Sequence, residues 1–380
     1  MTKIGSFIQQ KEGYKAFILE PFPPNDLIKW DNNLISLLSQ ADMAIGKLNA
    51  INELIPDVDF FILMYMKKEA AISSQIEGTQ ATLIDLIKAE AKLEDEKPPS
   101  DVDEIKNYVK AMNYGIKRLK SLPLSLRLIR ETHKELLHGV RGHHKLPGEF
   151  RRSQNWIGGA TLQTAVFVPP TVSEMQKALN DLEKFIHDKN HGFPELIKIG
   201  IIHAQFETIH PFLDGNGRIG RLLITLYLIN EGILSKPLLY LSDYFNKYRS
   251  DYYNRLNEYR TREGISTWLK YFLEGVRIVS GEAIETALKI SRLREEDMKK
   301  ISTFGRNAET ALVLLNKLYS NPIVDTKLVG KLSGISSKAN ISALINKFTK
   351  AKILHEITGR SRYQRFIYRE YLKLFSREKS

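Results

Sequence analysis

The chain has 380 residues, is 43% hydrophobic, carries a net charge of +12 and contains no cysteine. The lack of cysteine excludes disulfides, thiolate metal sites and thiol nucleophiles, and it is compatible with a reducing cytoplasm. A globular chain of this length is expected to form two or three domains, and residues 301–380, with fifteen Lys and Arg against five Asp and Glu, hold most of the net charge.

Neither a secretion signal nor a membrane span is predicted. The N-terminal residues lack the apolar segment of a signal peptide. The most apolar window, Leu222 to Leu241, is interrupted by Asn230, Glu231 and Lys236, which indicates a buried helix and its exit. We therefore expect a cytoplasmic protein that does not enter a membrane.

The first 100 residues are predicted to form an arm followed by helices. Residues 1–25 are mixed in character and end in Pro21 to Pro24, which favours an extended arm. From Asn25 onward apolar residues recur at spacings of three and four, the pattern of an amphipathic helix. A second helix is predicted from Asp59 to about Ile76.

The second helix is expected to end with Gly78 in its C′ position. Glu77 then lies at the negative end of the helix dipole, where a carboxylate is unfavourable unless it meets a cation from elsewhere in the fold. A solvent-exposed Glu77 is the alternative that this stretch alone favours.

Residues 101–290 are predicted to be helical apart from one hairpin. Helices are expected at 101–120, 125–137, 171–190, 194–209 and 268–290. Strand and turn residues in 147–159 and 166–170 predict a short hairpin between them, which could cover a site or cap the structure.

The stretch His210–Arg221, HPFLDGNGRIGR, joins two predicted helices and concentrates the chemistry of the chain. Glycines and Asx residues at its centre favour a loop, and the loop enters a helix whose free N–H groups and dipole attract anions. Asp214 can hold a divalent metal that bridges phosphate oxygens, and Arg218 and Arg221 share one helix face. These residues predict a phosphate-binding loop with a histidine base beside it.

A tyrosine-rich segment, Pro237–Tyr253, follows this loop. Tyrosines near a phosphate site can stack on a nucleobase, although helix packing is their commoner role. Lys247 and Tyr252 are the candidates for nucleotide contact in this segment.

The last 80 residues are predicted to form a separate basic domain after a charged connector at 291–300. Asp325 is the expected N-cap of a helix that stops at Gly334, and a second helix follows from Ser337 to Lys350. A β-hairpin completes an order of elements that looks like a winged helix. A DNA-binding role and a protein-docking or dimerising role are equally open. The expected DNA contacts are Lys338, Lys347, Arg360, Arg362 and Arg365.

Two motifs carry a resemblance to a known family. The loop sequence matches the Fic-domain signature, HPFx(D/E)GNGRxxR, and Ser73, Glu77 and Gly78 resemble the family's inhibitory motif, [S/T]xxxE[G/N]. With the arm and the basic domain, the chain resembles a bacterial subgroup of autoinhibited protein adenylyltransferases.

The resemblance implies a mainly α fold, with a Fic-type helical core, a small β-hairpin flap and a C-terminal winged-helix domain. The implied domains are an arm and inhibitory region at 1–100, a catalytic core at 101–290, a linker at 291–300 and the winged helix at 301–380.

The resemblance also assigns roles to the loop residues. His210 would be the general base, Asp214 would hold Mg²⁺, and Arg221 would receive the γ-phosphate of ATP. Arg218 would stabilise charge on the β-phosphate, and the flap would align the target segment by β-augmentation. Phe212 would be an apolar anchor. The remaining expected nucleotide contacts are Gly215, Asn216, Gly217, Ile219, Gly220, Lys247, Tyr252 and the inhibitory Glu77.

The implied reaction moves AMP from ATP to a Ser, Thr or Tyr hydroxyl of a target protein, with Glu77 blocking the γ-phosphate position through Arg221. Gly217 is compatible with nucleotidyl transfer but does not fix the base, so other nucleotide donors stay open. Self-modification and a homodimer also stay open. The alternatives are a DNA-binding regulator whose core only senses nucleotide, and the reverse reaction, in which Glu77 orients a water that removes AMP.

Overall fold

The computed structural model describes residues 4–23, 28–54, 58–91, 99–190, 192–261 and 264–375. In these residues the chain is mainly helical, as predicted, with two small antiparallel sheets. The α-helices before the basic domain are α1 (Asn32–Leu54), α2 (Val58–Ile76), α3 (Leu83–Glu90), α4 (Val102–Leu119), α5 (Leu126–Leu136), α6 (Val172–His187), α7 (Glu195–Ile209), α8 (Asn216–Asn230), α9 (Ser242–Lys247), α10 (Arg249–Tyr259) and α11 (Gly264–Ser302).

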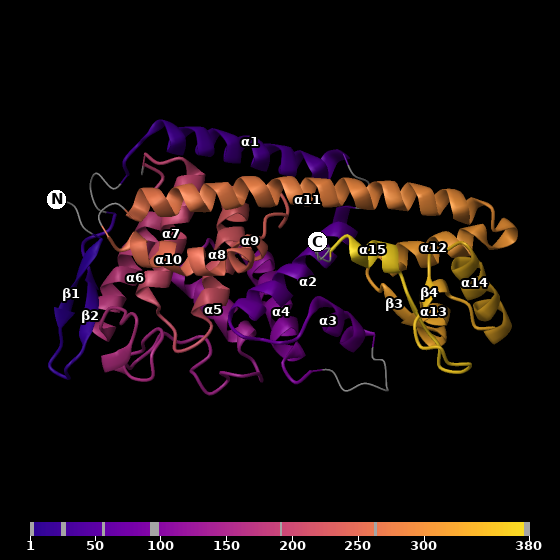
Figure 1. The fold of residues 1–380 in the computed structure, drawn as a ribbon, viewed down its shortest axis with the longest axis horizontal. Helices are drawn as coiled ribbons and strands as arrows, with labels where there is room; N and C mark the ends of the chain where they lie inside the picture. Colours follow the sequence, from indigo (N-terminus) through magenta and orange to yellow (C-terminus); the bar gives the residue numbers. More distant parts are fainter. Residues whose placement is uncertain are drawn as a thin grey trace.

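The helical body is assembled around α7, which is buried on all sides from Leu196 to Ile209. Helices α8 and α11 both pack against it, and α1 lies along α11 (Figure 1). Helix α2 reaches the body through α4 and α9. This packing brings the C-terminal end of α2 to the N-terminal end of α8, although the two are about 140 residues apart in the sequence.

The N-terminal arm contains a β-hairpin that the sequence did not reveal. Strands β1 (Gly5–Gln9) and β2 (Lys15–Leu19) pair antiparallel. The Phe17 N–H donates to the Val168 carbonyl at 2.9 Å, so this hairpin extends the segment predicted as the flap. Pro24 and the next three residues of the predicted arm region lie outside the described residues.

The predicted flap hairpin is shorter than expected. Its two sides form one antiparallel bridge, Ile157 with Phe167, closed by backbone hydrogen bonds of 2.8 and 3.1 Å. Gly158 and Gly159 have positive φ angles of 66° and 72°, which turn the chain immediately after the bridge. On the other side, Pro169 and Pro170 lack the N–H donors that a longer ladder would need.

The predicted linker at 291–300 is wrong. These residues belong to α11, which runs without a break for 39 residues, about 58 Å at helical rise. Its charged residues look like a solvated connector in the sequence, but Asp297 within it is only 1% exposed. The Asp297 carboxylate accepts from the Tyr368 hydroxyl at 2.5 Å, and this buried contact attaches the C-terminal module directly to the helix.

The C-terminal module, residues 305–375, follows α11 at the opposite end of the molecule from β1 and β2 (Figure 1). Its antiparallel sheet has the order β3-β5-β4. Asp325 caps α13 by accepting from the Leu328 N–H at 2.6 Å, and Gly334 ends that helix in the left-handed conformation, as predicted. Its elements are α12 (Ala308–Leu318), β3 (Ile323–Asp325), α13 (Thr326–Ser333), α14 (Lys338–Lys350), β4 (His355–Glu356), β5 (Arg365–Ile367) and α15 (Arg369–Lys373).

The structure removes two residues from the predicted DNA contacts. The Lys347 ammonium donates to the Phe304 carbonyl at 2.8 Å and to Asn307 Oδ1 at 2.9 Å, so it ties α14 to the start of the module. Arg365 is 8% exposed within β5. Lys338, Arg360 and Arg362 are exposed. Among the described residues, no helix has both the length and the apolar character needed to cross a membrane.

Candidate active site

The loop between α7 and α8 is fixed by an unusual backbone conformation and by an amide side chain. His210 ends α7 in the left-handed region, at φ 49° and ψ 61°, and Gly215 begins the next helix at φ 78°. The Asn216 side chain accepts from the Phe212 N–H and donates to the Phe212 carbonyl, both at 2.8 Å. The side chain of Asn216 therefore holds the loop closed.

Helix α8 begins at Asn216, inside the signature loop. The first helical hydrogen bond found in the loop runs from the Ile219 N–H to the Gly215 carbonyl at 3.0 Å. Helix geometry therefore leaves the N–H groups of Asn216, Gly217 and Arg218 without intrahelical acceptors. Free N–H groups at a helix N-terminus can bind an anion, which is the role that the loop composition predicts for this segment.

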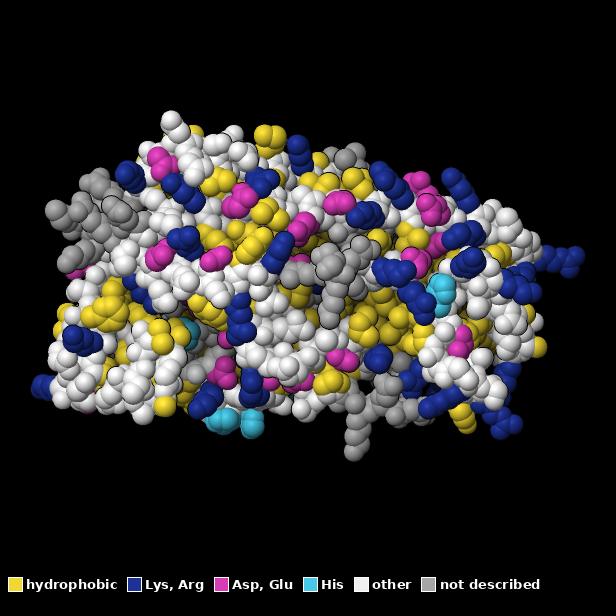
Figure 2. Space-filling model, in the orientation of Figure 1, with side chains coloured by type: hydrophobic (Ala, Val, Ile, Leu, Met, Phe, Trp, Pro, Cys, Tyr) yellow, Lys and Arg dark blue, Asp and Glu magenta, His cyan; other side chains and the backbone are white. Residues whose placement is uncertain are grey.

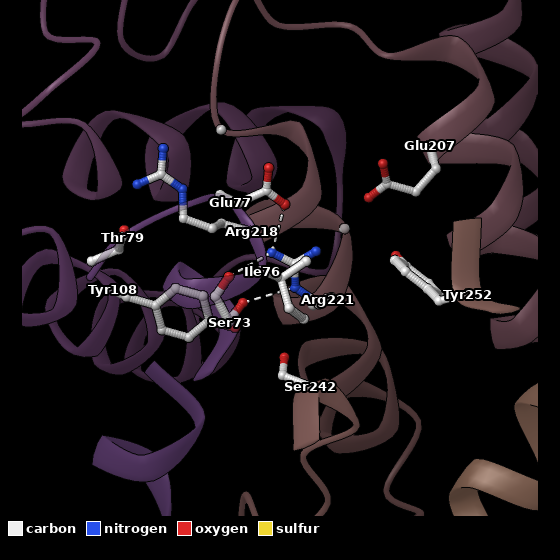
Figure 3. A network of polar contacts seen from close by, with 12 residues as sticks. Ser73, Ile76, Glu77, Thr79, Tyr108, Glu207, Arg218, Arg221, Ser242 and Tyr252 are labelled. Atoms are coloured by element: carbon white, nitrogen blue, oxygen red, sulfur yellow. Dashed lines mark hydrogen bonds and ion pairs between the residues drawn. The ribbon is translucent and has the colours of Figure 1, made fainter. Parts of the chain in front are cut away.

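Arg221 is the centre of the contacts between α8 and α2 (Figure 3). Its Nε donates to Ser73 Oγ and its Nη2 donates to the Ser73 carbonyl, both at 2.8 Å. Nη2 also forms an ion pair with Glu77 Oε1 at 2.8 Å. The guanidinium is 2% exposed, so the pair lies in a poorly solvated environment where charge-assisted hydrogen bonds are strong.

Glu77 is ionised at neutral pH in this environment. Burial opposes its ionisation, but the Arg221 guanidinium outweighs burial and holds the pKa of Glu77 below its usual value. The carboxylate also lies against Gly217, where an added Cβ would come within 2.2 Å of Glu77 Oε1. Glycine at 217 is thus required for Glu77 to reach Arg221 from this side.

The end of α2 is clamped at its carbonyl groups. Gly78 turns the chain at φ 97°, as predicted for the C′ residue. Arg249 donates to the Ile76 carbonyl at 2.7 Å, and Arg141 donates to the Glu77 carbonyl at 3.3 Å. Cations at a helix C-terminus offset the negative end of the dipole, so these two arginines compensate for the unfavourable location of Glu77.

Arg218 is buried and held by carboxylates on two sides. Its side chain is 1% exposed and lies 3.3 Å from Glu104 Oε2 and 3.4 Å from Asp214 Oδ1. Glu104, on α4, also accepts from the Thr79 hydroxyl at 3.0 Å. Glu104 could not be predicted from the sequence, because it lies more than 100 residues before the loop on an otherwise ordinary helix.

His210 has its ring next to the preceding turn of α7. Nδ1 is 3.3 Å from the Glu207 carbonyl, which leaves Nε2 as the nitrogen available to act as a base. Burial lowers the pKa of His210 to about 4, so the ring is neutral at physiological pH. A neutral imidazole can accept a proton from a hydroxyl.

Three residues outside the signature hold the loop backbone. Arg151 Nε donates to the His210 carbonyl at 3.1 Å, and Asn155 Nδ2 donates to the Phe212 carbonyl at 2.9 Å. His133 stacks on Phe212, with ring centroids 3.7 Å apart, and bonds the Asp214 carbonyl at 2.9 Å. Phe212 is fully buried between these groups, which fits the anchoring role predicted for it.

Three of the expected nucleotide contacts are buried in the packing around α8, and a fourth is exposed. Ile219 is 2% exposed and its N–H is used inside the helix. Gly220 faces inward, where a Cβ would come within 2.1 Å of Glu207 Oε1. Tyr252 is 1% exposed and its hydroxyl bonds His203 Nε2 at 3.0 Å. Lys247 is exposed and lies over the Tyr248 ring, 5.3 Å from its centroid.

Comparison with solved structures identifies the fold class. A Fic family protein from Desulfovibrio desulfuricans superposes on 90% of this chain and 97% of its own, with a TM-score of 0.56 and 19% identity. A Fic domain containing signaling protein from Bacteroides thetaiotaomicron superposes on 67% of this chain, with a TM-score of 0.51 and 20% identity. At these identities the comparisons establish the fold.

The sequence comparisons give the family. Residues 35–117 match the Fic/DOC family N-terminal region and residues 123–228 match the Fic/DOC family itself. The chain belongs to the Fic/DOC family.

Two curated relatives illustrate the similarity. A probable protein adenylyltransferase of Aquifex aeolicus is 26% identical over 53% of this chain and 57% of its own length. The protein adenylyltransferase Fic of Aedes aegypti is 32% identical over 36% of this chain and 25% of its own length. The alignments thus span between a quarter and just over half of these relatives.

Proposed function

We propose that this protein is an adenylyltransferase that moves AMP from ATP to a hydroxyl of a target protein and is restrained by its own Glu77. The observation that carries the proposal is the ion pair between the partly exposed Glu77 and the buried Arg221, formed on the first turns of α8, whose N-terminus can bind an anion. The relatives named protein adenylyltransferases support the reaction type.

The free N–H groups of Asn216, Gly217 and Arg218 would bind the phosphates, and Arg221 would bind the terminal one. His210 Nε2 would take the proton of the target hydroxyl, whose oxygen attacks the α-phosphorus while pyrophosphate leaves. Positioning and charge neutralisation supply most of the catalysis in such transfers.

Asp214 is suited to hold Mg²⁺ together with the phosphates. Its Oδ1 accepts from the Gly215 N–H at 2.6 Å, and its carboxylate approaches Gly142, where a Cβ would come within 2.7 Å of Oδ2. No group of three metal-binding side chains occurs in the described residues. A single carboxylate is nevertheless enough for Mg²⁺ that arrives with a nucleotide, because phosphate oxygens and water complete its coordination. The ion would neutralise phosphate charge.

The segment around the Ile157–Phe167 bridge is the proposed flap for the target. Val166 is 70% exposed beside this bridge, so the segment presents an apolar side chain and an extended backbone. An extended target segment could pair with it by strand addition. The helical region up to residue 290 would thus contain the restraint, the catalytic loop and the flap.

Replacing Glu77 tests the restraint. We expect Glu77→Gly to increase the initial rate of transfer of α-³²P label from ATP to protein by about 5- to 150-fold, the range of coupling energies between sites. The reason is that Arg221 loses its internal carboxylate and can receive the γ-phosphate. The measurement is labelling of a cell lysate by equal amounts of wild-type and variant protein.

Gln80→Gly is the matched control, because it places a glycine in the same exposed turn without touching Arg221. Equal labelling by wild-type protein and Glu77→Gly would contradict the restraint. Release of AMP from a pre-modified target by the wild-type protein, lost in Glu77→Gly, would instead assign Glu77 to the reverse reaction.

We propose a second function for the C-terminal module as a winged helix that binds duplex DNA. The exposed residues of α14 and the preceding turn are small, polar or basic, and α14 contains no acidic residue. Lys and Arg side chains gather over this module in Figure 2. Arg360, Arg362 and the 85% exposed Tyr363 occupy the turn between β4 and β5, where a wing would reach the DNA backbone.

The DNA proposal predicts a steep dependence of binding on salt. We expect the triple variant Lys338→Ala, Arg360→Ala, Arg362→Ala to reduce the slope of log K against log salt by about 2 to 3, roughly 1 for each lost phosphate contact. Fluorescence anisotropy with a mixed-sequence duplex gives the slope. The control replaces Lys110, Lys117 and Lys120, which are exposed on or beside α4, by alanine.

An unchanged slope in the Lys338, Arg360 and Arg362 variant would show that this face does not bind DNA. A protein-docking role for the module predicts that the wild-type protein binds the duplex no better than either triple variant.

A further inference from the structure

Glu207 is a buried carboxylate that the loop signature does not include. It lies on the last turn of α7, is 6% exposed, and its Oε1 has no hydrogen-bond partner in the structure. An unpartnered carboxylate oxygen at such a depth is costly and calls for a functional reason. In Figure 3 its carboxylate points toward the contacts of Arg221, from the side opposite Tyr108 and Thr79.

The neighbouring helix leaves room for this carboxylate at one position. A Cβ on Gly220 would come within 2.1 Å of Glu207 Oε1. Because any other residue at 220 would displace the carboxylate, Gly220 allows Glu207 to approach α8. This gives Gly220 a packing role on the inner face of α8.

The imidazole of His210 lies close to the Glu207 carboxylate. Oε2 is 3.9 Å from His210 Nδ1, and the same nitrogen is 3.3 Å from the Glu207 carbonyl. Donation from Nδ1–H to that carbonyl fixes the tautomer with a free Nε2. The carboxylate then faces the protonated edge of the ring, so it is well placed to stabilise an imidazolium.

The charged groups around this pair come from four other segments. Arg221 of α8, Glu77 at the end of α2 and Arg260 after α10 act on Glu207. Glu77, Arg151 of the segment after α5, and Arg260 act on His210. In the restrained protein the Glu77 carboxylate favours a protonated His210, and the Glu207 carboxylate lies 3.9 Å from His210 Nδ1. When Glu77 is replaced, Glu207 is the carboxylate that remains among these groups.

We propose that Glu207 is a positioning residue for His210: its carboxylate holds the imidazole edge and offsets the positive charge that the ring gains on taking the proton of the target hydroxyl. This inference rests on the proposed transfer reaction and deepens it. The proton itself moves from the hydroxyl to Nε2 of His210, and Glu207 acts through the ring without touching the substrate.

The effect of Glu207 on rate must follow its own ionisation. Burial raises the pKa of Glu207, Arg221 opposes the rise and Glu77 adds to it, which together bring the pKa to about 7; the pKa therefore falls when Glu77 is replaced. The carboxylate is charged above that pKa and neutral below it. In the Glu77→Gly protein, kcat should therefore rise with pH and reach its plateau at about pH 7 or below.

The test compares Glu77→Gly with Glu77→Gly/Glu207→Gln, a nearly isosteric neutral replacement. We expect kcat to fall about tenfold, the change that one pKa unit of lost stabilisation produces, while KM for ATP stays the same. The rise of kcat with pH that follows ionisation of Glu207 should disappear. Tyr259→Phe is the control, because it removes a buried hydrogen bond to Gln205 on the same helix without facing His210.

A second measurement is independent of catalysis. The ring signals of His210, followed by NMR, should shift as Glu207 ionises at about pH 7 or below in the parent protein, and this shift should be absent in the Glu207→Gln protein. Ring signals that do not change with the ionisation of Glu207, together with an unchanged pH profile, would overturn the role of Glu207. If Glu77→Gly transfers no AMP, the proposed reaction fails, whereas the titration still decides whether Glu207 acts on His210.

Discussion

Replacing His210 by alanine in the Glu77→Gly protein should reduce the transfer rate by about 10²- to 10⁴-fold, the usual contribution of a general base. His210 ends α7 in a left-handed backbone conformation, its Nδ1 lies next to the Glu207 carbonyl, and burial keeps the ring neutral with a pKa of about 4. Without the imidazole, the target hydroxyl loses the proton acceptor that the loop supplies. Initial rates of α-³²P transfer measure the effect.

His143→Ala is the matched control, since that histidine is exposed and bonds only locally to the Val140 carbonyl. Nucleotide affinity should persist in the His210→Ala protein, because its phosphate-binding N–H groups belong to the first turn of α8. Transfer at the parental rate by this variant would exclude His210 as the base.

Replacing Arg221 by alanine, also in the Glu77→Gly protein, should reduce transfer from ATP by about 10²- to 10³-fold, as loss of one charge-stabilising donor does in other sites. Arg221 is 2% exposed and loses its counter-charge when Glu77 is removed, so a γ-phosphate is the expected replacement. Two hydrogen bonds to Ser73 still hold the guanidinium in place.

The donor nucleotide distinguishes this role from a general loss of structure. The Glu77→Gly protein should use ATP much faster than ADP, because only ATP carries a γ-phosphate for Arg221. In the Arg221→Ala variant that preference should vanish while the rate with ADP stays the same. Equal losses with both nucleotides would show that Arg221 supports the fold and has no selective contact with the γ-phosphate.

The sequence was most informative where function needs adjacent residues. The loop from His210 to Arg221 is continuous, so its glycines, its Asp and its two arginines could be read together as an anion site. The end of α2 was also predictable, because Gly78 supplies the left-handed residue that terminates a helix. Asp325 and Gly334 marked the limits of α13 in the same local way.

Residues that reach the site only through tertiary packing could not be predicted from local sequence motifs. Glu104, His133 and Arg151 lie on segments with ordinary composition, and only the fold brings them to Arg218 and the loop backbone. Glu207 could not be singled out because α7 is buried on all sides, so its hydrophobic periodicity does not distinguish a core face from a functional face.

The incorrect predictions have physical causes as well. Tyr252 was expected at the nucleotide, but its ring stacks on Phe245 at 4.4 Å and its hydroxyl satisfies buried His203. Residues 291–300 were read as a linker because of their charge, yet charged side chains on an exposed helix face are equally compatible with a continuous helix. Lys347 was read as a surface cation, although its long stem reaches back to Phe304.

The central claim is that the loop performs adenylyl transfer once Glu77 is removed. The most direct measurement incubates Glu77→Gly protein and a lysate with ATP labelled at either the α- or the γ-phosphorus. Label should reach protein from the α position only, with one pyrophosphate released for each AMP attached. Transfer of γ-label, or no transfer from either position, would contradict the account.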